Sequence, residues 1–118
     1  VDIYTKLDLN YPHATSSITL GIGVKTEGNM VISGTKGYVY VPAPWWLTSF
    51  FEIRYEDQSR NRKFFYSWDG DGLRYEIQEF MSMIVNGRKN SYKLRHEESE
   101  AICGIIENFN SKVNYKEL

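Results

Sequence analysis

The sequence predicts an α+β fold in which strands come first and helices follow. The first 68 residues contain several stretches in which side chains of two kinds alternate, which is the period of a β-strand. From residue 73 onward, apolar residues recur at intervals of three and four, which is the period of an amphipathic helix. We therefore expect an open, mostly antiparallel sheet of about six strands. Two C-terminal helices are expected to pack on one face and leave the other face open for oligomerisation.

Length and composition limit the class of protein. The chain has 118 residues, a formal net charge of -1 and one cysteine, so residues 1–118 are expected to form one domain. A charge this close to zero gives no electrostatic reason to expect nucleic acid or a membrane as partner. The two histidines, His13 and His96, provide no metal-binding spacing with the cysteine. One cysteine cannot form a disulfide within the chain, and neither a targeting leader nor an apolar run of membrane-spanning length is seen, so we expect a protein of the reducing cytoplasm.

The strands are predicted from alternation along the chain. Residues 1–10 alternate apolar and polar side chains, and a second alternation from Ile18 to Lys25 places Gly21 and Gly23 on one face. Glycine weakens a strand, so these two indicate close approach of another backbone or a bulky ring, with aromatic side chains of a neighbouring strand as the candidates. Glu27-Gly28-Asn29 is a hairpin turn signal. The remaining strands are expected at Met30–Ser33, Tyr38–Val41, Ser49–Glu56 and Lys63–Trp68.

Two helices are predicted after the strands. The first spans Leu73–Asn86, with Asp71 placed to cap it and Gly87 placed to end it. Capping explains Asp69 and Asp71 better than a cation site does. The second helix begins at His96-Glu97-Glu98, where negative charge in the first turn is favourable. Its apolar stripe consists of Ile102, Ile105, Ile106, Phe109 and Val113.

The stretch from Ile32 to Trp46 carries the most informative pattern. Two glycines enclose Thr35-Lys36 and indicate a turn before a strand. Pro42 and Pro44 then prevent further ladder pairing and hold the backbone extended. The Trp45-Trp46 pair is therefore expected on a stiff loop at the end of the strand.

Three short segments together resemble a known family. They are Gly-Thr-Lys-Gly-Tyr at residues 34–38, the segment Gly72–Phe80, and His96-Glu97-Glu98-Ser99 with Ile102. Their order and rough spacing resemble the C-terminal domain of the glucose-fructose oxidoreductase, inositol dehydrogenase and MocA-like oxidoreductases. The resemblance covers most of the chain from about Thr15 onward. It implies the substrate and oligomerisation domain of an NAD(P)-dependent oxidoreductase that acts on a sugar, polyol or related alcohol.

The resemblance also implies where the chemistry lies. In that family the dinucleotide-binding Rossmann domain, with a Glu-Lys-Pro motif that carries the catalytic lysine, comes before the part that this chain represents. We therefore expect no catalytic, cofactor-binding or metal-binding residue here, no activity of the chain by itself, and NAD or NADP bound by the full-length protein. The segment Gly21–Thr26 is not expected to hold a phosphate, because a turn follows it instead of a helix. The open sheet face is commonly the oligomer interface in that family, which implies a homodimer or larger homo-oligomer.

Five residues are candidates for substrate binding. Trp45 and Trp46 could line a pocket for a sugar or an aromatic substrate, or cover the end of the sheet or a subunit contact. Arg74 and Tyr75, just inside a helix N-terminus, could reach an anionic or hydroxylated ligand, or serve only as surface charge and packing. His13 could act as an acid or base, or be an ordinary loop histidine.

A second hypothesis assigns no catalysis to the protein. The chain would then be a free-standing ligand-binding or dimerisation module, with the aromatic face of the sheet as its ligand site.

His96 is expected to belong to the start of its helix, and Cys103 is expected to be an inert packing thiol beside the apolar stripe.

Overall fold

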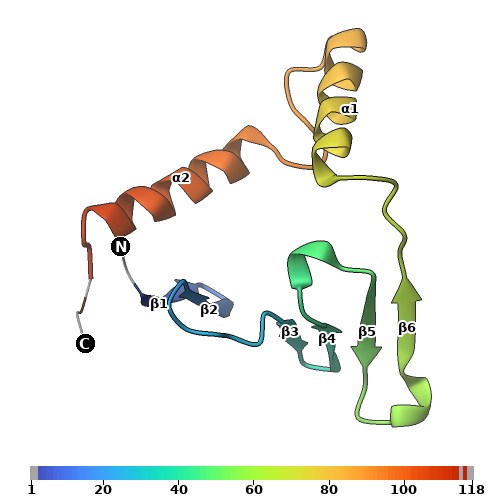
Figure 1. Cartoon of the computed structure of the whole chain (residues 1–118), viewed down its shortest axis with the longest axis vertical. Coiled ribbons are helices and arrows are strands. Elements are labelled where there is room, and N and C mark those ends of the chain that lie inside the picture. The colour runs from blue at the N-terminus through green and yellow to red at the C-terminus, as the bar shows by residue number, and fades with distance from the viewer. Residues whose placement is uncertain (1–2, 115, 117–118) are drawn as a thin grey trace. The chain divides into compact units, whose positions relative to one another are not determined.

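The structure is a computed structural model that describes residues 3–114 and residue 116. The described residues form six strands and two α-helices, which confirms the α+β class (Figure 1). The chain divides into two compact units, Val1–Ser67 and Trp68–Leu118. All six strands belong to the first unit and both helices to the second.

The first two strands form a hairpin of their own. Strand β1 (Tyr4–Tyr11) pairs antiparallel with β2 (Ala14–Gly21), and Tyr11 lies opposite Ala14, so that Pro12 and His13 form the turn. The predicted first strand is thus confirmed from residue 4, while residues 1 and 2 lie outside the described part. Strand β2 begins and ends four residues before the alternation that predicted it.

The early end of β2 is explained by a contact with Ile3, the residue before β1. The backbone N–H groups of Ile22 and Gly23 both donate to the carbonyl oxygen of Ile3, at 3.0 and 3.2 Å, which turns the chain out of the ladder. A methyl group added at Gly23 would lie 2.5 Å from Cγ2 of Ile3. Glycine is therefore required by close approach, as expected, but the approaching group is aliphatic and the expected aromatic ring is wrong.

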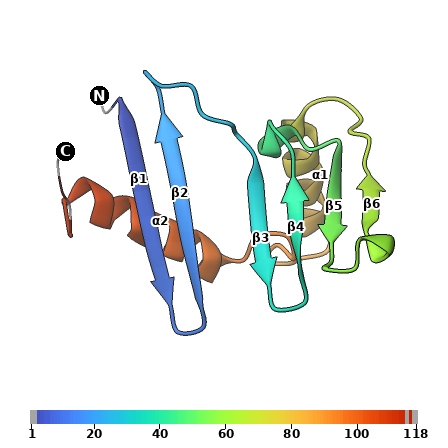
Figure 2. The same ribbon diagram turned by 90° about the horizontal axis from the view of Figure 1, so that it is seen from below.

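The other four strands form a second sheet in chain order (Figure 2). Neighbouring strands are antiparallel throughout this sheet. The strands are β3 (Met30–Gly34), β4 (Gly37–Val41), β5 (Phe50–Arg54) and β6 (Arg62–Phe65). The strand count agrees with the prediction, but the strands divide into two hydrogen-bonded sheets.

The division into two sheets corrects the hairpin expected at Glu27–Asn29. Strand β2 pairs with β1 and β3 pairs with β4, so this segment is an irregular link and not a hairpin turn. Gly28 has a φ of +70°, which favours glycine, and its carbonyl oxygen accepts a hydrogen bond from the N–H of Trp45 at 3.0 Å. Gly28 therefore contributes to a contact with the loop that carries Trp45 and not to a hairpin turn. The turn predicted at Thr35-Lys36 is confirmed, and it joins β3 to β4 as a hairpin with Gly34 opposite Gly37.

The register gives the four-stranded sheet two different faces. One face, which we call the aliphatic face, includes Val41, the one buried apolar side chain among the described residues, at 5% exposure. The aliphatic face carries Met30, Ile32, Val39, Val41, Phe51, Ile53 and Phe64, and Arg62 lies on it opposite Ile53. The opposite face, which we call the aromatic–polar face, carries Val31, Ser33, Tyr38, Tyr40, Phe50, Glu52, Arg54, Lys63 and Phe65.

The two helices begin where the sequence predicts. Helix α1 (Gly72–Val85) follows Asp71, which occupies the N-cap position without a side-chain hydrogen bond to the helix. Helix α2 (His96–Asn110) begins with His96, and its first turn is fixed by Glu98, whose Oε2 accepts from the N–H of Arg95 at 2.7 Å. The expected continuation of this helix to Val113 is wrong, because residues 111–114 form a turn in which Lys112 and Asn114 have positive φ.

The apolar residues of both helices are exposed. Ile77, Phe80 and Ile84 of α1 and Ile102 and Ile106 of α2 are each about half or more exposed. Cys103 is also exposed, so it does not have the packing role expected of it within its own unit. The packing of the helices on one face of the sheet stays a prediction, since helices and sheet belong to different units. In the described part of the chain, neither helix has the length and apolar character that a membrane crossing requires.

Candidate functional site

The Trp45-Trp46 pair lies on the loop between β4 and β5, as the sequence predicts. After Pro42 and Pro44 the chain forms a short 3-10 turn, Trp45–Leu47, in which the N–H of Leu47 donates to the carbonyl oxygen of Pro44 at 3.0 Å. The hydroxyl of Thr48 closes the turn by donating to the carbonyl oxygen of Trp45. Together with the bond from Trp45 to Gly28, these contacts fix the backbone of the loop at both of its ends.

The two indole rings meet edge to face. Their centroids are 6.1 Å apart and their planes lie at 86°, a favourable arrangement for aromatic pairs. Trp45 is 46% exposed and Trp46 is 61% exposed. A methyl group at Gly28 would lie 3.7 Å from the Trp46 ring, so the ring rests against the link between the two sheets. The loop thus presents a preformed apolar surface on which a ring-shaped ligand could stack.

Arg74 and Tyr75 make contacts around the segment that leads into α1. One guanidinium nitrogen of Arg74, Nη1, lies 2.5 Å from the carboxylate of Asp69 and 2.9 Å from its carbonyl oxygen. The hydroxyl oxygen of Tyr75 accepts from the N–H of Asp69 at 2.7 Å, and its ring meets Trp68 edge to face with centroids 5.2 Å apart. Both side chains therefore hold the Asp69–Asp71 loop against the helix. Asp69 serves as an ion-pair partner here, whereas the sequence suggested a capping role for it.

His13 lies at the tip of the β1–β2 hairpin, where its side chain is exposed. The structure thus brings Trp45 together with Trp46, and Arg74 together with Tyr75. The tryptophan pair and His13 belong to the first unit, and Arg74 and Tyr75 belong to the second. A binding role for these five residues stays a prediction.

A charged cluster lies in the middle of the aromatic–polar face. Glu52 accepts from Nε of Arg54 at 2.7 Å, is 2.6 Å from its Nη2 and is 3.5 Å from Nζ of Lys63. The guanidinium of Arg54 also lies 4.5 Å from the ring centroid of Tyr40, and Lys63 lies 3.7 Å from that of Phe50. The hydrogen bond from Arg54 lowers the pKa of the Glu52 carboxyl below its ordinary value of 4.5, and Lys63 acts in the same direction. Cations and rings are thus organised around one carboxylate.

The Glu52 cluster leads to a pH-dependent prediction. Because the pKa of Glu52 is lower in the folded state, its stabilising contribution is fully present above the unfolded value and is lost as the pH falls through the folded value. Glu52→Gln is therefore expected to lower the free energy of unfolding at pH 7, and this deficit should shrink steadily below about pH 4.5. Urea unfolding at several pH values measures it. The control is Glu56→Gln, which removes a carboxylate that has no ion pair in the described residues. A loss of unfolding free energy for Glu52→Gln that stays constant with pH would contradict the prediction.

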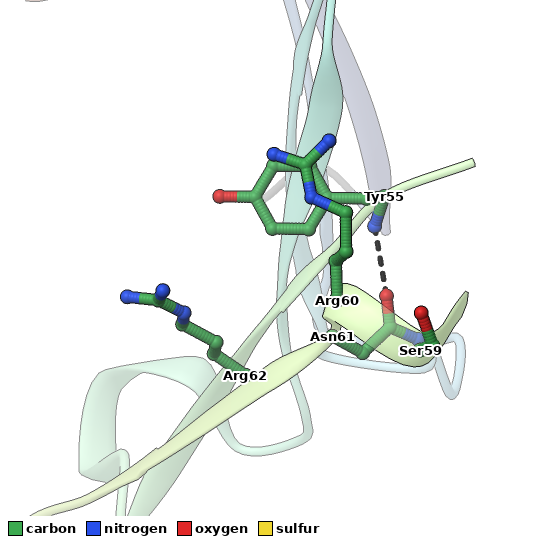
Figure 3. A pocket seen from close by; sticks show the side chains of 5 residues that line it. All are labelled: Tyr55, Ser59, Arg60, Asn61 and Arg62. Atoms are coloured by element: carbon green, nitrogen blue, oxygen red, sulfur yellow. Dashed lines mark hydrogen bonds between the residues drawn. The ribbon is translucent and has the colours of Figure 1, made fainter. Parts of the chain in front are cut away.

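The sequence interpretation missed a hollow beside the turn between β5 and β6. It has a volume of about 240 Å³ and is lined by Tyr55, Ser59, Arg60, Asn61 and Arg62 (Figure 3). The polar composition of residues 57–62 predicted only a loop. A usable signal was the placement of Arg60 and Arg62 two residues apart, with an aromatic residue directly after the preceding strand.

Metal sites and dinucleotide sites each need a particular grouping of residues. No group of three or more histidine, cysteine, aspartate or glutamate side chains comes together in the described ranges. The segment Gly21–Thr26 runs from β2 into an irregular link, without the helix whose N-terminus would face a pyrophosphate. The segment Gly21–Thr26 therefore lacks the strand–turn–helix context of a pyrophosphate-binding motif.

The described residues define an α+β fold, and a comparison with known proteins relates the chain to an oxidoreductase. It is similar to trans-1,2-dihydrobenzene-1,2-diol dehydrogenase from Oryctolagus cuniculus, with 29% identity over 114 residues. The similarity covers 91% of this chain and 34% of the dehydrogenase, so the chain spans about a third of the length of this relative. No protein-family model matches the chain. No solved structure matches it either.

Proposed function

We propose that residues 1–118 form the C-terminal domain of an NAD(P)-dependent oxidoreductase that acts on a sugar, a polyol or a related alcohol. The observation that carries this proposal is the similarity to a dehydrogenase over 91% of the chain but only 34% of the relative. A dinucleotide-binding domain would precede Val1 and hold the nicotinamide cofactor, which accepts the hydride. The present chain would supply a wall of the substrate pocket and the contact between subunits.

The loop with Trp45 and Trp46 supports the role in substrate binding. The relative is named for a cyclic vicinal diol, and sugars and cyclic polyols likewise combine hydroxyl groups with an apolar ring surface. Indole rings bind such surfaces by stacking, and the indole N–H can donate one directed hydrogen bond to a hydroxyl. The loop is fixed by backbone contacts while its rings remain about half exposed, so little order has to be gained on binding.

The aromatic–polar face supports the role as a subunit interface. Val31, Tyr38 and Phe65 on this face are 51%, 39% and 76% exposed. Apolar surface of this kind, interrupted by charges that are already paired, is typical of faces that associate with another protein surface. A homo-oligomer would cover these side chains and leave the Glu52 cluster neutralised by Arg54 and Lys63.

Titration calorimetry of the 118-residue chain separates this proposal from a free-standing binding module. The proposal predicts no heat of binding with NAD, NADP or a simple polyol such as inositol, because the cofactor site and most of the pocket would lie in another domain. A free-standing module would bind a small ligand through the aromatic–polar face, and the ligand would compete with self-association. Tight binding of NAD or NADP to the 118-residue chain would contradict the proposal.

A further inference from the structure

We propose that the hollow beside the β5–β6 turn is a binding site for an oxyanion group, the phosphate or carboxylate of a small ligand. The five side chains that line it are those of Tyr55, Ser59, Arg60, Asn61 and Arg62. They include two guanidinium groups and no carboxylate. This inference concerns a separate part of the first unit and does not rest on the proposed oxidoreductase function.

The charge balance of the arginines is the observation that carries the inference. The chain has six arginines. Four of them are paired with a carboxylate within 4 Å: Arg54, Arg74, Arg88 and Arg95. In the described part of the chain the other two, Arg60 and Arg62, make no ion pair, and these are the two that line the hollow. The two arginines that line the concave surface thus have no carboxylate within ion-pair distance in the described residues, even though Glu56 and Asp57 lie in the same turn, and guanidinium groups in this state favour an anionic ligand.

The walls of the hollow are held in place before any ligand binds. The guanidinium of Arg60 lies over the ring of Tyr55, 4.9 Å from its centroid. The side-chain oxygen of Asn61 accepts from the backbone N–H of Tyr55 at 2.8 Å (Figure 3). Asp57 fixes the start of the turn by accepting from the N–H and the hydroxyl of Ser59, at 3.0 and 2.6 Å. A preorganised site of this kind loses less entropy on binding.

The hydrogen-bonding inventory indicates which groups would contact the ligand. The hydroxyl hydrogen of Ser59 is already donated to Asp57, whose carboxylate would repel an anion on that side. Because the oxygen of Asn61 is used by Tyr55, its amide NH₂ remains as a donor. Figure 3 shows the guanidinium of Arg60 over the Tyr55 ring and that of Arg62 apart from it, and either guanidinium fork by itself can pair with two oxygens of a phosphate or carboxylate. A volume of about 240 Å³ accommodates such a group but lies below the range typical of sites that enclose a whole drug-sized molecule.

Nuclear magnetic resonance of the 118-residue chain tests this site with inorganic phosphate and succinate as probes at constant ionic strength. We expect saturable shifts of the Arg60 and Arg62 side-chain N–H signals and of the Tyr55 and Asn61 amides. Shifts with phosphate alone would identify a phosphate site, and similar shifts with both probes a general oxyanion site. Shifts that rise linearly with both probes would overturn the proposal.

Substitution of Arg62 provides the second part of the test. Arg62→Gln is expected to weaken binding of the effective probe at least tenfold. The matched control is Arg95→Gln, which removes the same charge from an exposed arginine that is already paired with Glu98, and it should leave binding unchanged. If both substitutions weaken probe binding equally, the effect comes from the overall charge of the chain, and this result would overturn the proposed site. The titration of the unsubstituted chain decides the question even if a variant fails to fold.

Discussion

Trp46→Ala in the full-length protein is expected to lower kcat/KM for a ring-shaped alcohol roughly 10- to 100-fold, which corresponds to about 1.4–2.8 kcal/mol of transition-state stabilisation. The indole is 61% exposed on a loop whose backbone is fixed by other residues, so its loss removes a stacking surface without removing a core residue. The effect should appear mainly in the KM for the alcohol. Steady-state kinetics with the alcohol and the cofactor varied separately measure it.

Two further variants distinguish stacking from general damage to the loop. Trp46→Phe keeps an aromatic face and should recover most of the lost kcat/KM. Tyr92→Ala removes an aromatic side chain that is 86% exposed on the second unit, and it should leave kcat/KM unchanged. If Trp46→Ala and the unsubstituted protein have the same kinetics, Trp46 does not line the substrate pocket.

Gly37→Ala is expected to destabilise the 118-residue chain by about 2–3 kcal/mol, the upper part of the range for overpacking. A methyl group at Gly37 would lie 2.5 Å from the carbonyl oxygen of Arg54 and 3.1 Å from Cδ1 of Tyr55. The first of these contacts is with backbone of the paired strand β5, which cannot move without breaking the ladder. Urea unfolding of both proteins measures the difference in the free energy of unfolding.

Gly104→Ala is the matched control for this substitution. Gly104 lies inside α2, and an added methyl group would meet no atom within 4 Å. Because alanine is the better helix former, this variant should be more stable by about 0.5–1 kcal/mol where helix formation is coupled to unfolding. A stability of Gly37→Ala equal to that of the unsubstituted chain would show that β4 and β5 do not approach as the structure describes.

The sequence predicted those elements whose pattern is local. Strands β3 to β6 follow from alternation and from the turn at Thr35-Lys36, and the start of α2 follows from His96-Glu97-Glu98. Helix α1 follows Asp71 as predicted, but the expected capping by the Asp71 side chain is wrong. The Trp45-Trp46 loop was also predicted, because two prolines end the strand locally, whereas its hydrogen bond to Gly28 was not predicted.

The features that the sequence did not predict depend on contacts between distant residues. Alternation continues to Val24, but β2 ends at Gly21 because Ile3 accepts two hydrogen bonds from the following residues. The turn signal at Gly28 produced no hairpin, because β2 pairs with β1 and β3 pairs with β4, and the carbonyl oxygen of Gly28 instead accepts from the N–H of Trp45. The Arg60–Arg62 hollow was missed for the same reason, since only the folded turn shows that neither arginine has a carboxylate partner in the described residues.

Hydride transfer by the full-length protein tests the central claim most directly. The protein should be incubated with NAD or NADP and a panel of cyclic vicinal diols, sugars and polyols, and formation of the reduced nicotinamide followed by its absorbance. We predict turnover of at least one member of the panel by the full-length protein and none by residues 1–118 alone. Absence of turnover across the panel with both cofactors, in a full-length protein shown to be folded, would contradict the assignment of this chain to an oxidoreductase.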